Sequence, residues 1–256
     1  MMNNYKYIIG IDQSLSNTSV VLFYIKTNSI LEIQNFNTKP FSKARLDLDS
    51  KLKNIYNCWY IDIRNMVLSI KDEIINWSEH YGFNSSSCII AVEKPNEGTQ
   101  SGFDIIYRLG YLFMLLNNIL SQHYQVVNVN NVSAKSVYFQ EDNKRMSKET
   151  LHEFFFDKRF KEYGLNLHAD KELNNDDRDA IVLIVFMLYY LNIYTNNDKK
   201  FQQKLKNHYC EALKTSGLCY YCKYLFECKK TKVKIPKRGH KLELFENARR
   251  NILEIF

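Results

Sequence analysis

Short apolar runs separated by polar turns open the chain, which is the pattern of consecutive β-strands. Residues 7–12 form a run rich in β-branched side chains, and residues 19–25 form a second. Residues 30–36 alternate between apolar and polar positions, as a strand with one buried face does. The pattern predicts three antiparallel strands joined in a meander.

Apolar positions at helical spacing follow the meander. They recur every three or four residues from 46 to 80, again from 104 to 120, and in an apolar segment from 176 to about 194. Two further strand-like runs, 87–93 and 125–130, each follow one of the first two helices. Because a helical crossover normally returns the chain to a parallel strand, we expect both runs to lie parallel to the first strand. The sequence therefore predicts an α/β fold, with a five-stranded mixed sheet flanked by helices.

Two of the predicted buried strands end on a carboxylate. Asp12 ends the first strand, and Glu93 ends the strand at 87–93. The carboxyl ends of parallel neighbours meet at one edge of an open sheet, where functional sites gather. An ionised carboxylate in a buried position is unfavourable unless a cation compensates its charge. The alternative for Asp12 is a side chain that only hydrogen-bonds within its own turn.

The start of the last predicted helix supplies two more acids. Asp176 and Asp179 have the i, i+3 spacing that places two side chains on one helix face. The helix dipole favours negative charge there, so acids that only stabilise the helix start are the alternative. Carboxylates gathered with Asp12 and Glu93 would repel one another unless divalent cations held them, and hard oxygen ligands select Mg²⁺ or Mn²⁺. Such a cluster is what two-metal phosphodiester hydrolysis requires.

Composition narrows the class of protein. With 256 residues, 45% of them hydrophobic, the chain can bury one substantial core and leave room for a small module. The net charge of +7 suits a polyanionic partner. The first residues lack the apolar core of a signal peptide, and the longest apolar run, 180–191, is too short to span a bilayer. We therefore expect a soluble cytoplasmic protein with no membrane partner.

A cysteine cluster lies beyond a polar linker at 196–200. Its spacing is Cys-x8-Cys-x2-Cys-x5-Cys, formed by Cys210, Cys219, Cys222 and Cys228. In a reducing compartment this spacing indicates a metal site, with His208 as a possible substitute ligand. Tetrahedral zinc is the conservative assignment. An iron–sulfur cluster is the alternative, because the last three cysteines also resemble those that hold such a cluster in some nucleases. Free thiols are the third possibility.

Basic and aromatic residues surround this cluster. Lys229 and Lys230 follow the last cysteine directly, and tyrosines lie between the cysteines. Interleaved cationic and aromatic side chains favour contact with nucleic acid. A solvated surface is the alternative.

The ordered set of elements and motifs resembles a known superfamily. A strand ending on Asp, two antiparallel strands, a helix, a strand ending on Glu, a helix, a strand and a helix opening Asp-x-x-Asp-Ala are similar to the RNase H-like (retroviral integrase) superfamily. Within it, the segments 10–16, 91–95 and 176–180 look most like RuvC-type Holliday junction resolvases. The resemblance implies an RNase H-like nuclease domain at 1–195. The linker, the cysteine spacing and the basic residues beyond it predict a basic Cys-rich metal-binding extension at 196–256.

The resemblance also implies an activity and roles for single residues. Members of this family are homodimers that cut four-way DNA junctions symmetrically with two Mg²⁺ (or Mn²⁺) ions in each active site. By analogy, Asp12 bridges both ions, Glu93 binds one, and Asp179 with Asp176 completes the site. Asp177 competes with Asp176 for that role.

Basic residues in the segment 131–148 have family counterparts as well. Lys135 and Lys148 match lysines placed near the scissile phosphate, and for both a solvated loop charge is the alternative. Lys144 and Arg145 are expected to contact the DNA backbone, where they would add affinity without sequence preference.

One departure concerns substrate selection. The bacterial enzymes place an aromatic wedge shortly after the strand-end Glu, whereas Lys94 and Pro95 follow Glu93 here. Phe103 could take that role, although a Phe at a helix start is more often part of a core. The departure leaves open an RNase H-like nuclease that cuts flaps or RNA-containing substrates, and a non-catalytic DNA-binding or assembly protein on the same fold.

Overall fold

A computed structural model of the chain describes residues 5–39, 59–95, 103–129, 165–167, 173–191 and 193. They belong to the first of the two compact units into which the chain divides, Met1–Thr195 and Asn196–Phe256. The second unit lies outside the described residues, so the predicted Cys-rich extension and its metal stay predictions.

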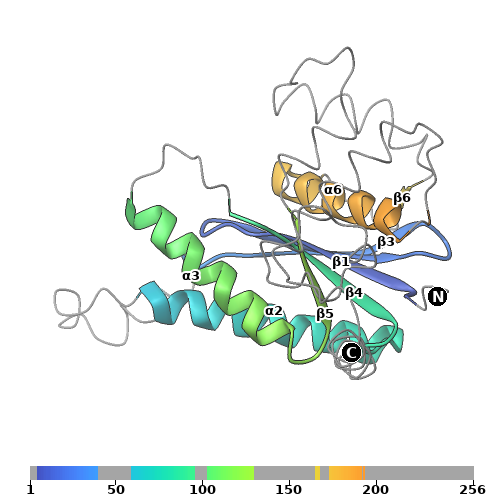
Figure 1. Ribbon diagram of the computed structural model, residues 1–256, viewed down its shortest axis with the longest axis horizontal. Coiled ribbons are helices and arrows are strands. Elements are labelled where there is room, and N and C mark those ends of the chain that lie inside the picture. The colour runs from blue at the N-terminus through green and yellow to red at the C-terminus, as the bar shows by residue number, and fades with distance from the viewer. Residues whose placement is uncertain are drawn as a thin grey trace, which may run out of the picture. The chain divides into compact units, whose positions relative to one another are not determined.

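A mixed β-sheet is the centre of the described fold (Figure 1). Strands β1 (Tyr7–Asp12), β2 (Thr18–Tyr24) and β3 (Ser29–Phe36) pair antiparallel in chain order, which confirms the predicted meander. Strand β4 (Cys88–Glu93) lies parallel to β1, and β5 (Gln125–Val129) lies parallel to β4. These five strands, in the order β3-β2-β1-β4-β5, confirm the predicted α/β class with a five-stranded mixed sheet.

A sixth strand, β6 (Asn166–Leu167), extends the sheet beside β3 and was not predicted. It pairs parallel with β3 through Ser29 and Ile30, and the N–H of Asn166 donates to the carbonyl oxygen of Asn28 at 3.0 Å. A strand of two residues is too short to produce a hydrophobic period, which is why the sequence pattern does not reveal it.

Helices lie on both faces of the sheet. α2 (Trp59–Tyr81) and α3 (Phe103–Leu120) cover one face, and α6 (Asn175–Tyr190) covers the other (Figure 1). The part of the predicted first helix at 46–58 lies outside the described residues. None of the helices in the described ranges is both long and apolar enough to cross a membrane.

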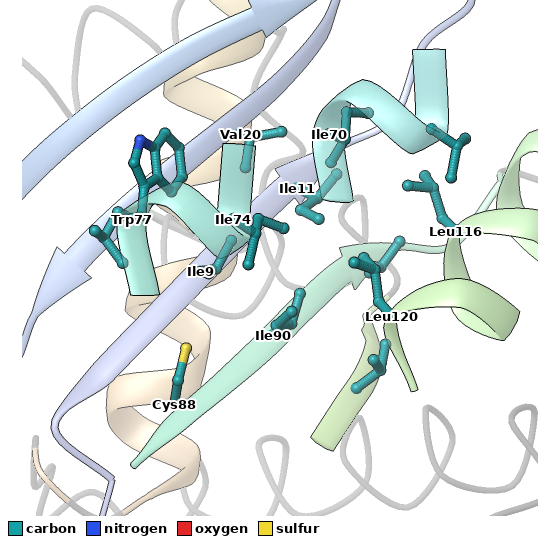
Figure 2. Close-up of a cluster of buried hydrophobic side chains, with 14 of the residues drawn as sticks. Ile9, Ile11, Val20, Ile70, Ile74, Trp77, Cys88, Ile90, Leu116 and Leu120 are labelled. Atoms are coloured by element: carbon teal, nitrogen blue, oxygen red, sulfur yellow. The ribbon is translucent and has the colours of Figure 1, made fainter. Parts of the chain in front are cut away.

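The face under α2 and α3 carries the main apolar core (Figure 2). Alternate residues of the strands point into it, because successive side chains of a strand face opposite sides. The sheet contributes Ile9, Ile11, Val20, Leu22, Cys88, Ile90 and Val92; the helices contribute Ile63, Met66, Val67, Ile70, Ile74, Trp77, Leu112, Leu116 and Leu120. The intervening strand residues therefore face α6, and Asp12 is one of them.

β1 and α6 pack closely against each other at Gly10. A Cβ atom at this position would lie 2.4 Å from the carbonyl oxygen of Ala180 and 3.0 Å from Cγ1 of Ile184. Only glycine allows the helix backbone to approach the strand this closely. Asp12, two residues further along β1, is on the same face. This packing brings Asp12 to the beginning of α6.

A capping box fixes where α6 begins. The side chain of Asn174 accepts hydrogen bonds from the N–H groups of Asp176 and Asp177, both at 2.9 Å, and Asp177 accepts one from the N–H of Asn174 at 3.0 Å. The helix ends at Tyr190, before the predicted end near residue 194. There the N–H of Leu191 donates to Met187 O at 2.8 Å and closes the last turn.

Candidate active site

Asp12 and Glu93 lie side by side at the ends of parallel strands. The β1–β4 register runs from Tyr7 opposite Cys88 to Ile11 opposite Val92, so Asp12 and Glu93 are the next residues on each strand. Both face α6, and their side chains share a hydrogen bond. Two carboxyl groups can share a hydrogen bond only when one of them carries a proton.

The environment of Asp12 strongly disfavours its ionised form. Its side chain is 5% exposed. Burial raises the pKa of Asp12 well above its usual range, and the hydrogen bond and charge of Glu93 raise it further. The charges of Asp179 and Asp176 raise the same pKa. Glu93, Asp179 and Asp176 therefore all act on the carboxyl group of Asp12.

The two acids of α6 come from a helix end held against the sheet. Asp179 is buried, and Asp176 is partly buried. The Nδ2 group of Asn17, in the turn between β1 and β2, donates to Oδ2 of Asp176 at 2.6 Å. A neutral amide thus orients this carboxylate without cancelling its charge. Asp176, rather than Asp177, is the residue whose charge reaches Asp12.

Asp177 has a different set of partners and is fully buried. Its Oδ1 atom accepts hydrogen bonds from Ser19 Oγ at 2.7 Å and from Asn35 Nδ2 at 3.0 Å. Ser19 and Asn35 are paired across β2 and β3, which places both on the face toward α6. With the capping bond to Asn174, these contacts attach the start of α6 to the sheet.

Replacing Asp177 with Ala should destabilise the fold by about 2–4 kcal/mol, because it removes a helix cap and leaves the buried Ser19 donor and the partly buried Asn35 donor without their acceptor. Urea unfolding of the purified protein measures this difference. The same replacement at Asp72, which is exposed on α2, should change stability by less than about 0.5 kcal/mol. A loss below about 1 kcal/mol at Asp177 would mean that these hydrogen bonds do not hold the helix.

The acidic residues fit divalent cations by their chemistry. All four offer hard carboxylate oxygens, the ligands that Mg²⁺ and Mn²⁺ prefer, and a cation would remove the repulsion that raises the Asp12 pKa. Within the described ranges, however, no three His, Cys, Asp or Glu side chains converge tightly enough to form a ready metal-binding group. The arrangement is a carboxyl pair with two further acids nearby.

The other predicted site residues lie outside the described residues. These are Lys135, Lys144, Arg145 and Lys148 of the basic segment, and Cys210, Cys219, Cys222, Cys228, Lys229 and Lys230 of the C-terminal module. Their roles stay predictions. The backbone of Phe103 begins α3, and its proposed wedge role is likewise untested.

Four polar residues of the site were missed by the sequence analysis: Gln13, Asn17, Ser19 and Asn35. Ser19 carries a usable signal, because it is a polar residue at the start of a run that is otherwise apolar, directly opposite Asp12 in the β1–β2 register. The amides of Gln13, Asn17 and Asn35 look like ordinary turn or edge residues until the register is known.

No family model matches the chain, and no curated protein matches it. Among solved structures, it is similar to *Thermus thermophilus* RuvC in complex with a Holliday junction substrate, with 12% identity and a TM-score of 0.46, over 74% of this chain and 96% of that one. A *T. thermophilus* RuvC structure gives the same identity and TM-score over 73% and 96%. The fowlpox virus Holliday junction resolvase is 12% identical, with a TM-score of 0.35, over 73% and 99%.

Proposed function

We propose that this protein is a metal-dependent DNA endonuclease of the RuvC type that resolves four-way junctions by two-metal phosphodiester hydrolysis. The observation that carries the proposal is the burial of Asp12 beside Glu93, with Asp176 and Asp179 acting on the same carboxyl group. Repulsion and burial within such a cluster destabilise the fold unless cations bind there. Acidic residues in destabilising positions are typical of functional sites.

Each acidic residue has a defined part in the proposed mechanism. Asp12 and Glu93, at the ends of neighbouring parallel strands, would hold the ions from the sheet. Asp176 and Asp179 approach from α6 and complete the ligand set. Mg²⁺ or Mn²⁺ held there would supply a Lewis acid for the phosphate and lower the pKa of the attacking water. Asp12 and Glu93 would have to be ionised to hold the ions, because carboxylates bind metal in their ionised form.

The proposed substrate and assembly follow from the motif resemblance. A homodimer would present two such sites to a four-way junction, and α3 is the helix expected to form its interface. Supporting this, large apolar side chains of α3 are exposed, namely Ile105, Ile106, Tyr107 and Met114. Lys135, Lys144, Arg145 and Lys148 would contact DNA near the cut, and Lys229 and Lys230 of the zinc or iron–sulfur module would add further contacts.

A panel of labelled substrates tests the proposed reaction. With Mg²⁺, synthetic four-way junctions should be cut in symmetrical pairs to give ligatable nicks, and EDTA should abolish cutting. Preferential cutting of flaps or RNA–DNA hybrids would instead favour the related RNase H-like function. Binding of all substrates without any cutting in Mg²⁺ or Mn²⁺ would indicate a DNA-binding protein. Denaturing gels measure the cutting of each substrate, and native mobility-shift gels measure binding without cutting.

Added Mg²⁺ should stabilise the protein more at about pH 8 than at about pH 5. The pKa of Asp12 is higher in the folded protein than in the unfolded chain, where it is about 3.9. Without metal, its contribution to stability is therefore present below that value and is lost as the pH rises through the folded pKa. At high pH the ionised carboxylates bind the cation, which adds about 2.7 kcal/mol at a hundredfold excess over its dissociation constant.

Thermal unfolding with and without Mg²⁺ at both pH values measures this effect. The Asp12→Asn variant serves as the control, because it removes the titrating group and should flatten the difference. If Mg²⁺ raised the unfolding temperature of the wild-type protein equally at both pH values, metal binding would not depend on the ionisation of Asp12.

A further inference from the structure

The backbone pairing between β1 and β4 ends before the two residues that bear the carboxyl groups. The last paired residues are Ile11 and Val92, one step short of Asp12 and Glu93. On its other side, β4 remains attached for longer: Glu93 pairs with Val129, and the N–H of Lys94 donates to the carbonyl oxygen of Val129 at 2.7 Å. Glu93 is thus fixed toward β5 by the backbone, whereas toward β1 the sheet hydrogen bonds have ended.

The side chain of Gln13 bridges this gap. Its Nε2 group donates to the backbone carbonyl oxygen of Glu93 at 2.9 Å. Gln13 directly follows Asp12, so the bond connects the residue after one carboxylate to the residue that bears the other. It acts as one more rung of the ladder, at the point where the separation of Asp12 and Glu93 is set.

The remaining atoms of Gln13 show that stability alone does not explain its presence. The side chain is 7% exposed, and its buried Oε1 atom has no hydrogen-bond partner among the described residues. A buried acceptor without a donor destabilises a fold, and an apolar side chain of similar shape would avoid that cost. A residue that weakens the fold while linking two site residues is characteristic of a functional position.

We infer that Gln13 is a positioning residue that sets the separation of Asp12 and Glu93 for cation binding. The inference rests on the proposed function, because it assigns these two carboxylates to one metal site. Side chains that orient metal ligands without touching the ion typically alter affinity or activity about 10- to 100-fold when they are replaced.

Two substitutions remove the bridge in different ways. Gln13→Met keeps the approximate size of the side chain and removes the donor. Gln13→Asn keeps the amide, but its side chain is one methylene too short to reach the same carbonyl oxygen. Gln34→Met is the matched control, because Gln34 is exposed on β3 of the same sheet.

Mn²⁺ binding to the full chain, measured by electron paramagnetic resonance, tests the inference together with thermal unfolding in EDTA. Both Gln13 variants should bind Mn²⁺ at least about tenfold more weakly. Gln13→Met should unfold in EDTA at the wild-type temperature or above, whereas a purely structural role predicts a lower one. Gln34→Met should match the wild type in both measurements.

The outcomes separate this inference from the proposed function. Wild-type Mn²⁺ affinity in both Gln13 variants overturns the inference and leaves the proposed function intact. A Gln13→Met protein that unfolds at a lower temperature and binds Mn²⁺ normally once folded also overturns it. A wild-type protein that binds no Mn²⁺ at the acidic cluster overturns the proposed function and this inference together.

Discussion

Replacing Asp12 with Asn is expected to reduce junction cleavage by about a thousandfold, since loss of a central metal ligand removes several kcal/mol of transition-state stabilisation. Junction binding should persist, because the expected DNA contacts come from other residues. The same substitution should raise the unfolding temperature of the metal-free protein near neutral pH. It replaces a buried carboxylate, whose pKa is raised by burial and by Glu93, with a neutral amide of the same shape.

The combination of lost activity and gained stability is what makes this variant informative. A residue that only satisfies its own turn would lose stability on substitution and would leave cleavage unchanged. Single-turnover cleavage assays and thermal unfolding in EDTA measure the two effects on one preparation. The same change at the exposed residue Asp72 should affect neither. Junction cleavage that survives Asp12→Asn would rule out the two-metal mechanism.

The Gly10→Ala substitution should lower the free energy of unfolding by about 1–3 kcal/mol and cleavage by about a hundredfold. The new methyl group would meet the carbonyl oxygen of Ala180 at 2.4 Å, closer than such atoms can approach. Backbone atoms cannot rotate away, so α6 must move relative to β1. That helix carries Asp176 and Asp179, and a displacement of about 1 Å is enough to impair a catalytic site.

Gly110→Ala on α3 is the matched control for this substitution. A Cβ atom at Gly110 would meet no atom of the described residues within 4 Å, and alanine favours a helix over glycine by about 0.5–1 kcal/mol. The same chemical change should therefore destabilise the protein at one glycine and stabilise it at the other. Urea unfolding of both variants measures the sign of each change in stability. Equal effects at the two positions would show that the close approach of α6 to β1 does not limit the fold.

The strands and the two strand-end acids could be predicted because the physical signal is local. Buried strands appear as short apolar runs, and a carboxylate at the end of such a run is unusual enough to be noticed. The direction of β4 and β5 followed from the helical crossovers, which the structure confirms. The spacing of Asp176 and Asp179 put both on one face of α6, and the charges of both reach Asp12.

The polar residues around the acids could not be predicted in the same way, because their roles depend on register. Asn35 becomes a partner of Asp177 only when β3 is aligned with β2 and α6 is placed over both. Gln13 meets Glu93 only because one ladder ends a residue earlier than the other. The different roles of Asp176 and Asp177 likewise could not be told from the sequence. They depend on the capping box, in which Asp177 is paired with Asn174 at the start of α6.

The parallel pairing of β1 with β4 also affects the order in which the fold assembles during synthesis. β1, β2 and β3 are close in sequence and can pair as soon as they are synthesised, but β1 gains its second neighbour only after α2 and β4 follow. Long-range pairing of this kind is slow relative to local hairpins. Asp176 and Asp179 of α6 are synthesised later still. A growing chain therefore carries Asp12 without its companions, and the cluster is assembled only when the last helix of the described fold docks onto the sheet.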